Sequence, residues 1–223
     1  MYTDYIDQIG QKEKKVIELE LMTDKADPKK VDRILNSAFE EFGLNGFEKA
    51  STNKIVKNAG VSKGLLFHYF GSKQYLYDYL VAFTFEKTTE LLSANIDWEE
   101  GDLLNRLKQI FFLKLSIVRE YPCFYKFIKR VIPDRNIDGL QGTIYEDMTE
   151  LVHKIYSYQI DYSLFREDIN VNHAIEIIHW TFEKFAEEKW KNCAEEVDMY
   201  QFAREAESFR HTLKAVFYKQ TTP

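Results

Sequence analysis

The stretch from Ser51 to Lys73 constrains the fold of this 223-residue chain most, because its signals favour two short helices joined by a tight turn. Ser51 or Thr52 supplies a side-chain oxygen for the unpaired amides of a first helical turn. Gly60 ends that helix with a residue free to adopt positive φ, and Ser62 is the expected N-cap of the next helix. A helix, a short glycine-containing turn and a second helix predict a helix-turn-helix, whose second helix can enter the major groove of DNA.

The sequence of residues 59–73, AGVSKGLLFHYFGSK, resembles the signature of TetR-type transcriptional regulators. In that family the pattern AGVS-x-G-x-[LF]-[YF]-x-[YH]-F-x-[ST]-K spans the turn, the recognition helix and the start of the following helix. The resemblance covers residues 28–80, and the last two-thirds of the chain contain no comparable motif. It implies an N-terminal DNA-binding domain followed by a helical domain for effector binding and dimerisation.

The distribution of charge agrees with this resemblance. The whole chain has a net charge of −6, yet residues 28–73 contain eight Lys/Arg and four Asp/Glu, a net charge of +4. Residues 74–223 are acidic, with a net charge of −7. One basic module at one end of an acidic protein is typical of a DNA-binding protein whose remainder has a different role.

Helical periodicity extends through the rest of the chain and predicts an all-α fold. A first helix is expected from Pro28 to Phe42, ended by Gly43, and a long helix from Ser72 to Ser93. On the helix over 102–119, Lys114 is expected to snorkel from the flank of the apolar stripe. Further helices are predicted over 122–132, 140–160, 170–191 and 198–218. The predicted domains are an N-terminal extension over 1–27, a helix-turn-helix domain over 28–73 and a helical effector-binding and dimerisation domain over 74–223.

Bulk features favour a cytoplasmic protein. No apolar run approaches the length of a membrane span, and residues 1–10 lack the basic and apolar regions of a signal peptide. Cys123 and Cys193 have no metal-ligand spacing, so both are expected to be small apolar filler in a reducing compartment. Met22 is an alternative start of translation, which the intact mass of the endogenous protein would test.

The resemblance implies which side chains meet DNA. Lys63, Leu65 and His68 would face base edges, where Lys63 suits guanine and Leu65 suits a thymine methyl group. Gly64 would let the helix backbone approach the groove floor closely. The remaining expected contacts are a base edge from Asn53, the helix cap at Ser62, and phosphates from Thr52, Tyr69 and Lys73.

A single recognition helix is too little for specific affinity, so we expect a homodimer on a double-stranded operator, its two reading heads ~34 Å apart. The last two predicted helices have long apolar stripes suited to a four-helix bundle between protomers. The alternative is that part of each stripe is buried within one protomer. The interface residues predicted are Ile178, Phe182, Phe185, Phe209, Leu213 and Val216.

An effector pocket in the C-terminal helices is a further implication of the resemblance. The abundance of aromatic residues there favours a small lipophilic or flat aromatic effector, although each aromatic residue alone is more typical of a plain core. The candidate pocket residues are Phe111, Phe112, Phe127, Tyr145, Tyr156, His179 and Trp180.

Two Glu-x-x-His pairs, Glu150 with His153 and Glu176 with His179, favour rival functions. This spacing places a carboxylate and an imidazole on one helix face, and two such pairs with two further glutamates form a di-iron site. A metal-carboxylate enzyme and a metal-responsive regulator are therefore alternatives. The prediction we adopt is a repressor released by a small molecule, with no catalytic residue, metal or cofactor. The alternative in another class is a structural or division-type DNA-binding protein with a protein partner.

Overall fold

The computed structural model describes residues 27–131, 143–191 and 198–220, with the side chains of residues 143–146 left out. The predicted extension and Met22 fall on residues 1–26, outside the described residues. All elements within the described ranges are helices apart from one isolated bridge between Phe165 and Tyr218, so the predicted all-α class is confirmed. In these ranges no helix is both long and apolar enough to cross a membrane.

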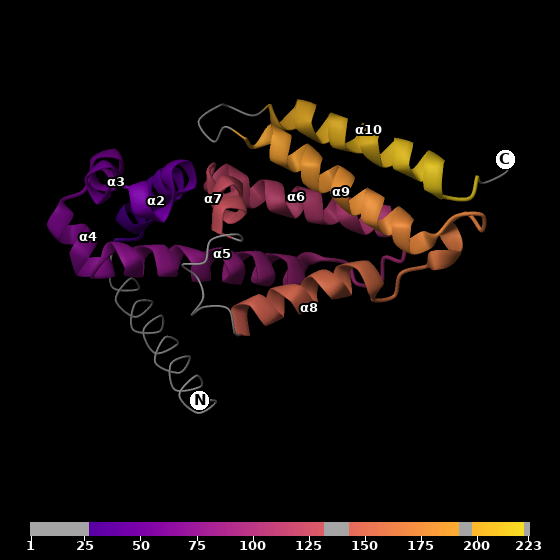
Figure 1. Ribbon diagram of the computed structural model, residues 1–223, viewed down its shortest axis with the longest axis horizontal. Helices are drawn as coiled ribbons and strands as arrows, with labels where there is room; N and C mark the ends of the chain where they lie inside the picture. The colour runs from indigo at the N-terminus through magenta and orange to yellow at the C-terminus, as the bar shows by residue number, and fades with distance from the viewer. Residues whose placement is uncertain (1–26, 132–142, 192–197, 221–223) are drawn as a thin grey trace.

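The helices form two groups joined by one long helix (Figure 1). The helices α2, α3 and α4 gather at one end, and α5 runs from them along most of the molecule. α8 lies beside α5, whereas α6, α9 and α10 form a second layer and α7 lies next to α2. The bounds are α2 Pro28–Lys49, α3 Thr52–Ala59, α4 Lys63–Phe70, α5 Lys73–Asn95, α6 Leu103–Glu120, α7 Phe124–Val131, α8 Thr143–Ser157, the short 3-10 helix η2 Tyr162–Leu164, α9 Val171–Lys189 and α10 Met199–Phe217.

The expected end of the first helix is wrong, because Gly43 does not stop it. Gly43 is buried within α2, where a β-carbon would lie 3.4 Å from the backbone nitrogen of Phe127 on α7. The helical path breaks three residues later at Gly46, whose φ of 71° lies in the left-handed region. Glycine at position 43 therefore serves close packing against α7 rather than helix termination.

The core is continuous from the helix-turn-helix domain into the C-terminal helices. Phe39 of α2 lies 5.4 Å from the ring centroid of Phe124 and 5.3 Å from that of Phe127. Both phenylalanines belong to α7, and they share one apolar cluster with Leu66 of α4 and Leu80 of α5. A displacement of α7 is consequently transmitted to α2 through direct side-chain contact.

A buried arginine joins α6 to the end of α8. The Arg106 side chain is fully buried, and its guanidinium donates to four backbone carbonyls. Four charge-assisted hydrogen bonds from one planar group fix these segments relative to each other. The accepting carbonyls are those of Trp98 at 3.1 Å, Glu100 at 2.6 Å, Ile155 at 3.2 Å and Tyr158 at 2.7 Å.

The expectation of a free thiol at Cys123 is wrong. Cys123 lies just before α7 with 6% of its surface exposed, and it is disulfide-bonded. Cys193 lies outside the described residues. The cysteines therefore do not support the expected reducing compartment.

Candidate nucleic-acid interface

The turn between α3 and α4 has the geometry that its glycine and serine predict. Gly60 adopts φ 63° and ψ 40°, and the amide of Val61 donates to the carbonyl of Val56 at 3.0 Å. A β-carbon on Gly60 would meet no atom within 4 Å, so the left-handed backbone alone favours glycine. Ser62 caps α4, since its hydroxyl oxygen accepts from the Leu65 amide at 3.1 Å.

The start of α3 is held by a residue that the sequence analysis missed. Ser51 is the N-cap but makes no side-chain capping bond. Instead, the buried carboxylate of Glu41 on α2 accepts the Ser51 amide at 2.9 Å and lies 3.9 Å from the Lys54 ammonium. The available signal was an acidic residue three positions after Ala38, on the apolar side of the predicted helix.

The outward face of α4 is formed by Lys63, Gly64 and His68, all of them exposed. Lys63 and Gly64 occupy the first turn, and the nearest atom to a β-carbon on Gly64 would be the Ser62 hydroxyl oxygen, 3.9 Å away. Leu65 is half-buried against the core. The face therefore presents one ammonium, one imidazole and a bare stretch of helix backbone.

The residues expected at phosphates differ in their exposure and in the contacts that they already make within the protein. Thr52 is half-buried at the start of α3, next to Asn53, which is exposed and was expected at a base edge. Tyr69 packs its ring into the core and keeps 9% of its surface exposed. The Lys73 ammonium donates to the Glu48 carbonyl at 3.2 Å and lies 4.7 Å from the centroid of the Phe47 ring. Lys73 thus fastens α5 to the end of α2, and a phosphate contact would use the ammonium's other donors.

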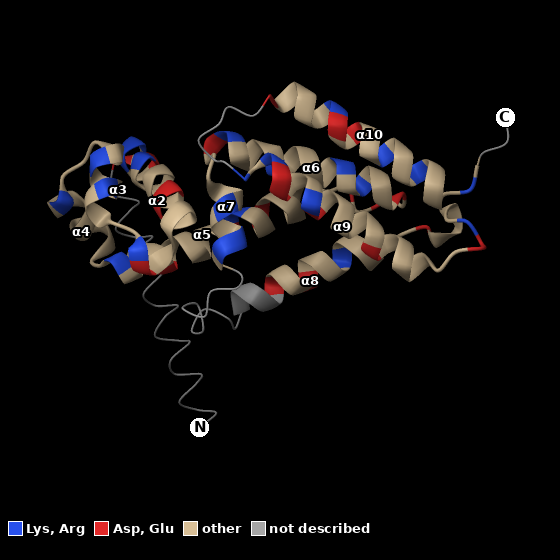
Figure 2. Ribbon diagram, turned by 45° about the horizontal axis from the view of Figure 1, so that its top comes forward, with Lys and Arg blue, Asp and Glu red and all other residues tan. Residues whose placement is uncertain are grey.

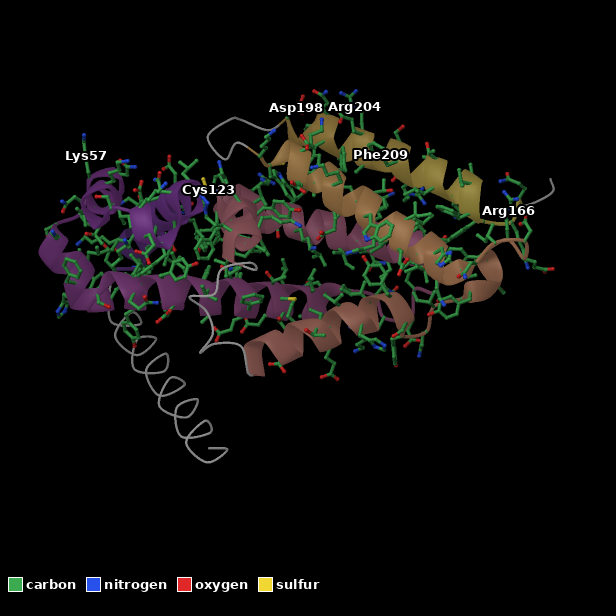
Figure 3. All side chains as sticks on the ribbon, viewed as in Figure 1. Lys57, Cys123, Arg166, Asp198, Arg204 and Phe209 are labelled. Atoms are coloured by element: carbon green, nitrogen blue, oxygen red, sulfur yellow. The ribbon has the colours of Figure 1, made fainter. Side chains whose placement is uncertain are left out.

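The surface around the turn is basic. Between Thr52 and Phe70 the chain contains Lys54, Lys57 and Lys63 and no acidic residue. Figure 2 shows Lys and Arg along α3 and at the start of α4, at the end of the molecule remote from the C-terminus. The Lys57 side chain points away from the protein (Figure 3). Exposed lysines beside a recognition helix attract the phosphate backbone through the release of counterions.

Comparison with known proteins agrees with this geometry. The family model of the TetR bacterial regulatory proteins matches residues 34–80, which include α3, α4 and the turn between them. Over these residues the chain is similar to the TetR regulators. The fold of the chain is also similar to that of KstR2, the ketosteroid transcriptional regulator of Mycobacterium tuberculosis, with a TM-score of 0.63 at 15% identity. That likeness covers 87% of this chain and 97% of KstR2. The family whose model matches is one of regulatory proteins and not of enzymes.

Two curated relatives match more locally. The nucleoid occlusion factor SlmA of Vibrio cholerae is 32% identical over 98 residues, which are 42% of this chain and 50% of SlmA. The HTH-type transcriptional regulator UidR of Escherichia coli K12 is 50% identical over 44 residues, which are 20% of this chain and 22% of UidR. The chain therefore spans half or less of the length of these relatives, and the likeness to UidR is confined to a short segment.

The structure separates the candidate effector residues. Phe111, Tyr156 and His179 line a cleft between α8 and the helices α6, α7 and α9, and the Tyr156 hydroxyl lies 2.7 Å from the Nδ1 atom of His179. Burial raises the pKa of Tyr156 well above its ordinary value, so this hydroxyl stays protonated. The other candidates do not line this cleft: Phe112 and Trp180 are 48% and 61% exposed, Phe127 is buried against α2, and the side chain of Tyr145 lies outside the described residues.

Lys114 is exposed, and its side chain lines the cleft. Sequence reasoning missed three further residues there. Tyr125, Glu183 and Trp190 line the same cleft. The helical periodicity places Lys114 on the flank of the apolar stripe, but only the surrounding helices show that this flank faces a hollow.

The two Glu-x-x-His pairs are not assembled into one site. His153 lies 3.2 Å from the Ser157 hydroxyl on its own helix, whereas His179 faces Tyr156. In the part of the chain that the structure describes, no three His, Cys, Asp or Glu side chains are grouped so that they could hold a metal ion. The rival metal-site functions gain no support from this arrangement.

The candidate interface residues divide into two sets. Ile178, Phe185 and Leu213 are 9% exposed or less and pack in the protomer's own core. Phe182 is half-buried, while Phe209 and Val216 are 42% and 47% exposed. Part of each apolar stripe is thus used within the protomer, and sequence reasoning missed the exposed Ile177 and Tyr200.

Proposed function

We propose that this protein is a sequence-specific DNA-binding transcriptional regulator, acting as a repressor that a small lipophilic or aromatic effector releases from its operator. The observation that carries the proposal is the outward face of α4, where Lys63, Gly64 and His68 project from a helix with fixed caps at both ends. The match to the HTH-type regulator UidR supports the same reading. A repressor of this kind acts in the cytoplasm, where its operator is.

Release follows from the contact between α7 and α2. One side of α7 packs on α2 through Phe127, and the Arg130 guanidinium donates to the Leu44 carbonyl at 3.3 Å. Other residues of the same helix, Tyr125 and Ile128, line the cleft. An effector in the cleft that favours a shifted α7 would therefore favour a shifted α2 and α3, and the protein would populate a state whose reading heads are spaced wrongly for the operator.

The proposal includes a homodimer built on the exposed sides of α9 and α10, which lie next to each other (Figure 1). Ile177 and Trp180 on α9, and Phe209 and Val216 on α10, are large apolar side chains at least 42% exposed. The Phe209 position on α10 is labelled in Figure 3. Apolar groups of this size at one surface are typical of subunit contacts.

The Phe209→Lys variant would place a charge in this proposed interface, so we expect it to be monomeric in analytical ultracentrifugation. A wild-type protein that is itself monomeric would contradict the dimer.

The test of the function is selection of genomic DNA fragments by the purified full-length chain, followed by sequencing. The proposal expects enrichment of a few promoter-proximal fragments that share an inverted repeat. Wild-type protein that enriches no fragment, under conditions where it is folded, would overturn it.

A nucleoid-associated, division-type function is the second candidate, and the match to SlmA favours it. The two functions predict different enrichment patterns. A regulator selects sites near promoters and releases them when an effector binds. A division-type protein selects many sites spread over the chromosome, ignores small molecules and retains a protein partner during purification.

A further inference from the structure

Lys114 is a cation at the cleft between the helices for which the structure shows no direct partner. Lys114 is exposed toward the cleft that it lines. Desolvation by the protein around the cleft lowers the pKa of its ammonium, despite the charge of Glu183 nearby. Within the described ranges the ammonium makes no hydrogen bond or ion pair. A cation that lines a mostly apolar cleft and has no partner there is available to pair with an anionic ligand.

The only carboxylate lining the described part of the cleft is already neutralised. The Lys129 ammonium donates to a carboxylate oxygen of Glu183 at 2.9 Å. Burial alone would raise the pKa of Glu183, but this hydrogen bond and the charge of Lys129 hold it below its ordinary value. Glu183 is therefore ionised and paired, and the positive charge of Lys114 is left in excess.

A second donor at the cleft also lacks an acceptor. Trp190, directly after α9, is 4% exposed, and its indole nitrogen has no hydrogen-bond partner among the described residues. Buried donors are almost always paired, so an exception calls for an explanation. Lys114 and Trp190 are both donors, and the group that would satisfy them is an acceptor with a negative charge.

The cleft is large enough for an organic molecule and is mostly apolar beyond these two donors. It consists of two hollows of about 160 Å³ and about 200 Å³, and both are lined by Lys114 and Trp190. One water molecule needs only ~10–15 Å³, so these are not simple packing defects. The first hollow continues between apolar side chains, chiefly Leu107, Ile110, Phe111, Ile155 and Phe182. The occupant must combine one anionic group with an apolar body.

We propose that this cleft binds an amphiphilic carboxylate, an ionised acyl or aryl carboxylic acid whose carboxylate lies between the Lys114 ammonium and the Trp190 indole N–H. One surplus cation matches the single charge of a carboxylate better than the two charges of a phosphate monoester. The apolar body lies along Phe111 and Ile155. The assignment rests on the proposed function only for the ligand's role as effector, because binding to the cleft requires no DNA.

The test is isothermal titration of the full-length protein without DNA, using matched probes. The acids are decanoate and 2-naphthoate, and each is compared with its alcohol and its amine. We expect at least one acid to bind at least tenfold more tightly than the corresponding alcohol and amine. Equal affinity for the three head groups, tighter binding of an amine, or no binding of either acid would overturn the assignment.

Two variants locate the head group. Lys114→Met keeps an apolar stem, and it should weaken binding of the acid at least tenfold, spare the alcohol and leave the thermal midpoint unchanged or higher. Trp190→Phe should weaken the acid several-fold. The matched control is Lys108→Met on the same helix, since Lys108 pairs with Glu207 at 3.4 Å outside this cleft and should leave affinity unchanged. Undiminished acid binding by Lys114→Met would refute the proposal.

The same protein preparation is tested separately for selection of genomic DNA. Selection of DNA without acid binding would refute the carboxylate site and leave the regulator intact. Acid binding without selection of DNA would support the site and refute the regulator.

Discussion

Lys63 and Lys73 differ in surroundings although both are lysines of the basic end. Lys63 projects from the first turn of α4 into solvent, whereas the Lys73 ammonium is already bound to the Glu48 carbonyl. A side chain on the recognition helix reads base edges, and one at the start of the following helix reaches only the backbone of the DNA.

Substitution by alanine should separate these two roles. Lys63→Ala should lose ~1–3 kcal/mol of discrimination between bases at one position of the operator. Lys73→Ala should weaken binding to all sequences and reduce the slope of log affinity against log salt concentration by ~1. Binding-site selection and salt titration measure the two effects. Unchanged base preference in Lys63→Ala would show that the proposed orientation of α4 is incorrect.

Asp102 shows how a single carboxylate can connect distant helices. Its oxygens accept from the amides of Leu104 and Asn105 at the start of α6, from the Tyr218 hydroxyl at 2.9 Å and from the Lys214 ammonium at 2.9 Å. Burial alone would raise the pKa of Asp102, but the hydrogen bonds from Lys214 and Tyr218 and the charge of Lys214 lower it. The ionised form therefore stabilises the fold.

Because the folded-state pKa of Asp102 is lowered, its contribution is complete above about pH 5, begins to fall as the pH approaches the unfolded value of ~3.9, and is lost as the pH falls through the lower folded-state pKa. Asp102→Asn should lower the free energy of unfolding by ~1–3 kcal/mol at pH 7 and should lose less stability than the wild type below about pH 4. Urea unfolding at several pH values measures both. Asp168→Asn, at an exposed ion pair with Arg166, is the control expected to have no measurable effect. An identical pH dependence in wild type and Asp102→Asn would contradict this account.

At the scale of elements, Arg106 is the residue that orders the C-terminal half. Its guanidinium donates to the carbonyls of Ile155 and Tyr158 at the end of α8 and to two carbonyls before α6. Arg106→Met would fill much of the space but leave these four carbonyls without their donor, and we expect a loss of at least ~3 kcal/mol of unfolding free energy.

Chemical denaturation measures the loss, and amide hydrogen exchange at the end of α8 locates it. Exposed Arg119→Met on the same helix is the matched control. A loss below about 1 kcal/mol in Arg106→Met would show that water replaces the guanidinium.

Elements whose signals are local were predictable from the sequence. The α3–α4 turn depends on the conformation of Gly60 and the cap at Ser62, and both are encoded within a few residues. The end of α2 was not predictable, because Gly43 is fitted against Phe127, more than eighty positions away. The same limit applies to Lys114: its place on the flank of the apolar stripe of α6 was visible, but the hollow it faces is formed by other helices.

The whole molecule connects a basic DNA-binding end to a cleft through one continuous core. Phe39 on α2 contacts α7, whose Tyr125 and Ile128 line the cleft. Residues 28–73 have a net charge of +4 and the rest of the chain is acidic, so binding should be oriented by this end and should weaken with salt. In the proposed homodimer, specificity then requires that α4 of each protomer reach base edges at the same time.

The most direct test is the affinity of the full-length protein for a selected genomic fragment and for a scrambled duplex of equal length, measured by fluorescence anisotropy at one fixed salt concentration. The account predicts binding to the selected fragment at least ~10³-fold tighter than to the scrambled duplex. It also predicts that most of this ratio is lost in a variant with both Lys63→Ala and His68→Ala. Equal affinity for the two duplexes, or a ratio unchanged in the double variant, would contradict sequence reading by α4.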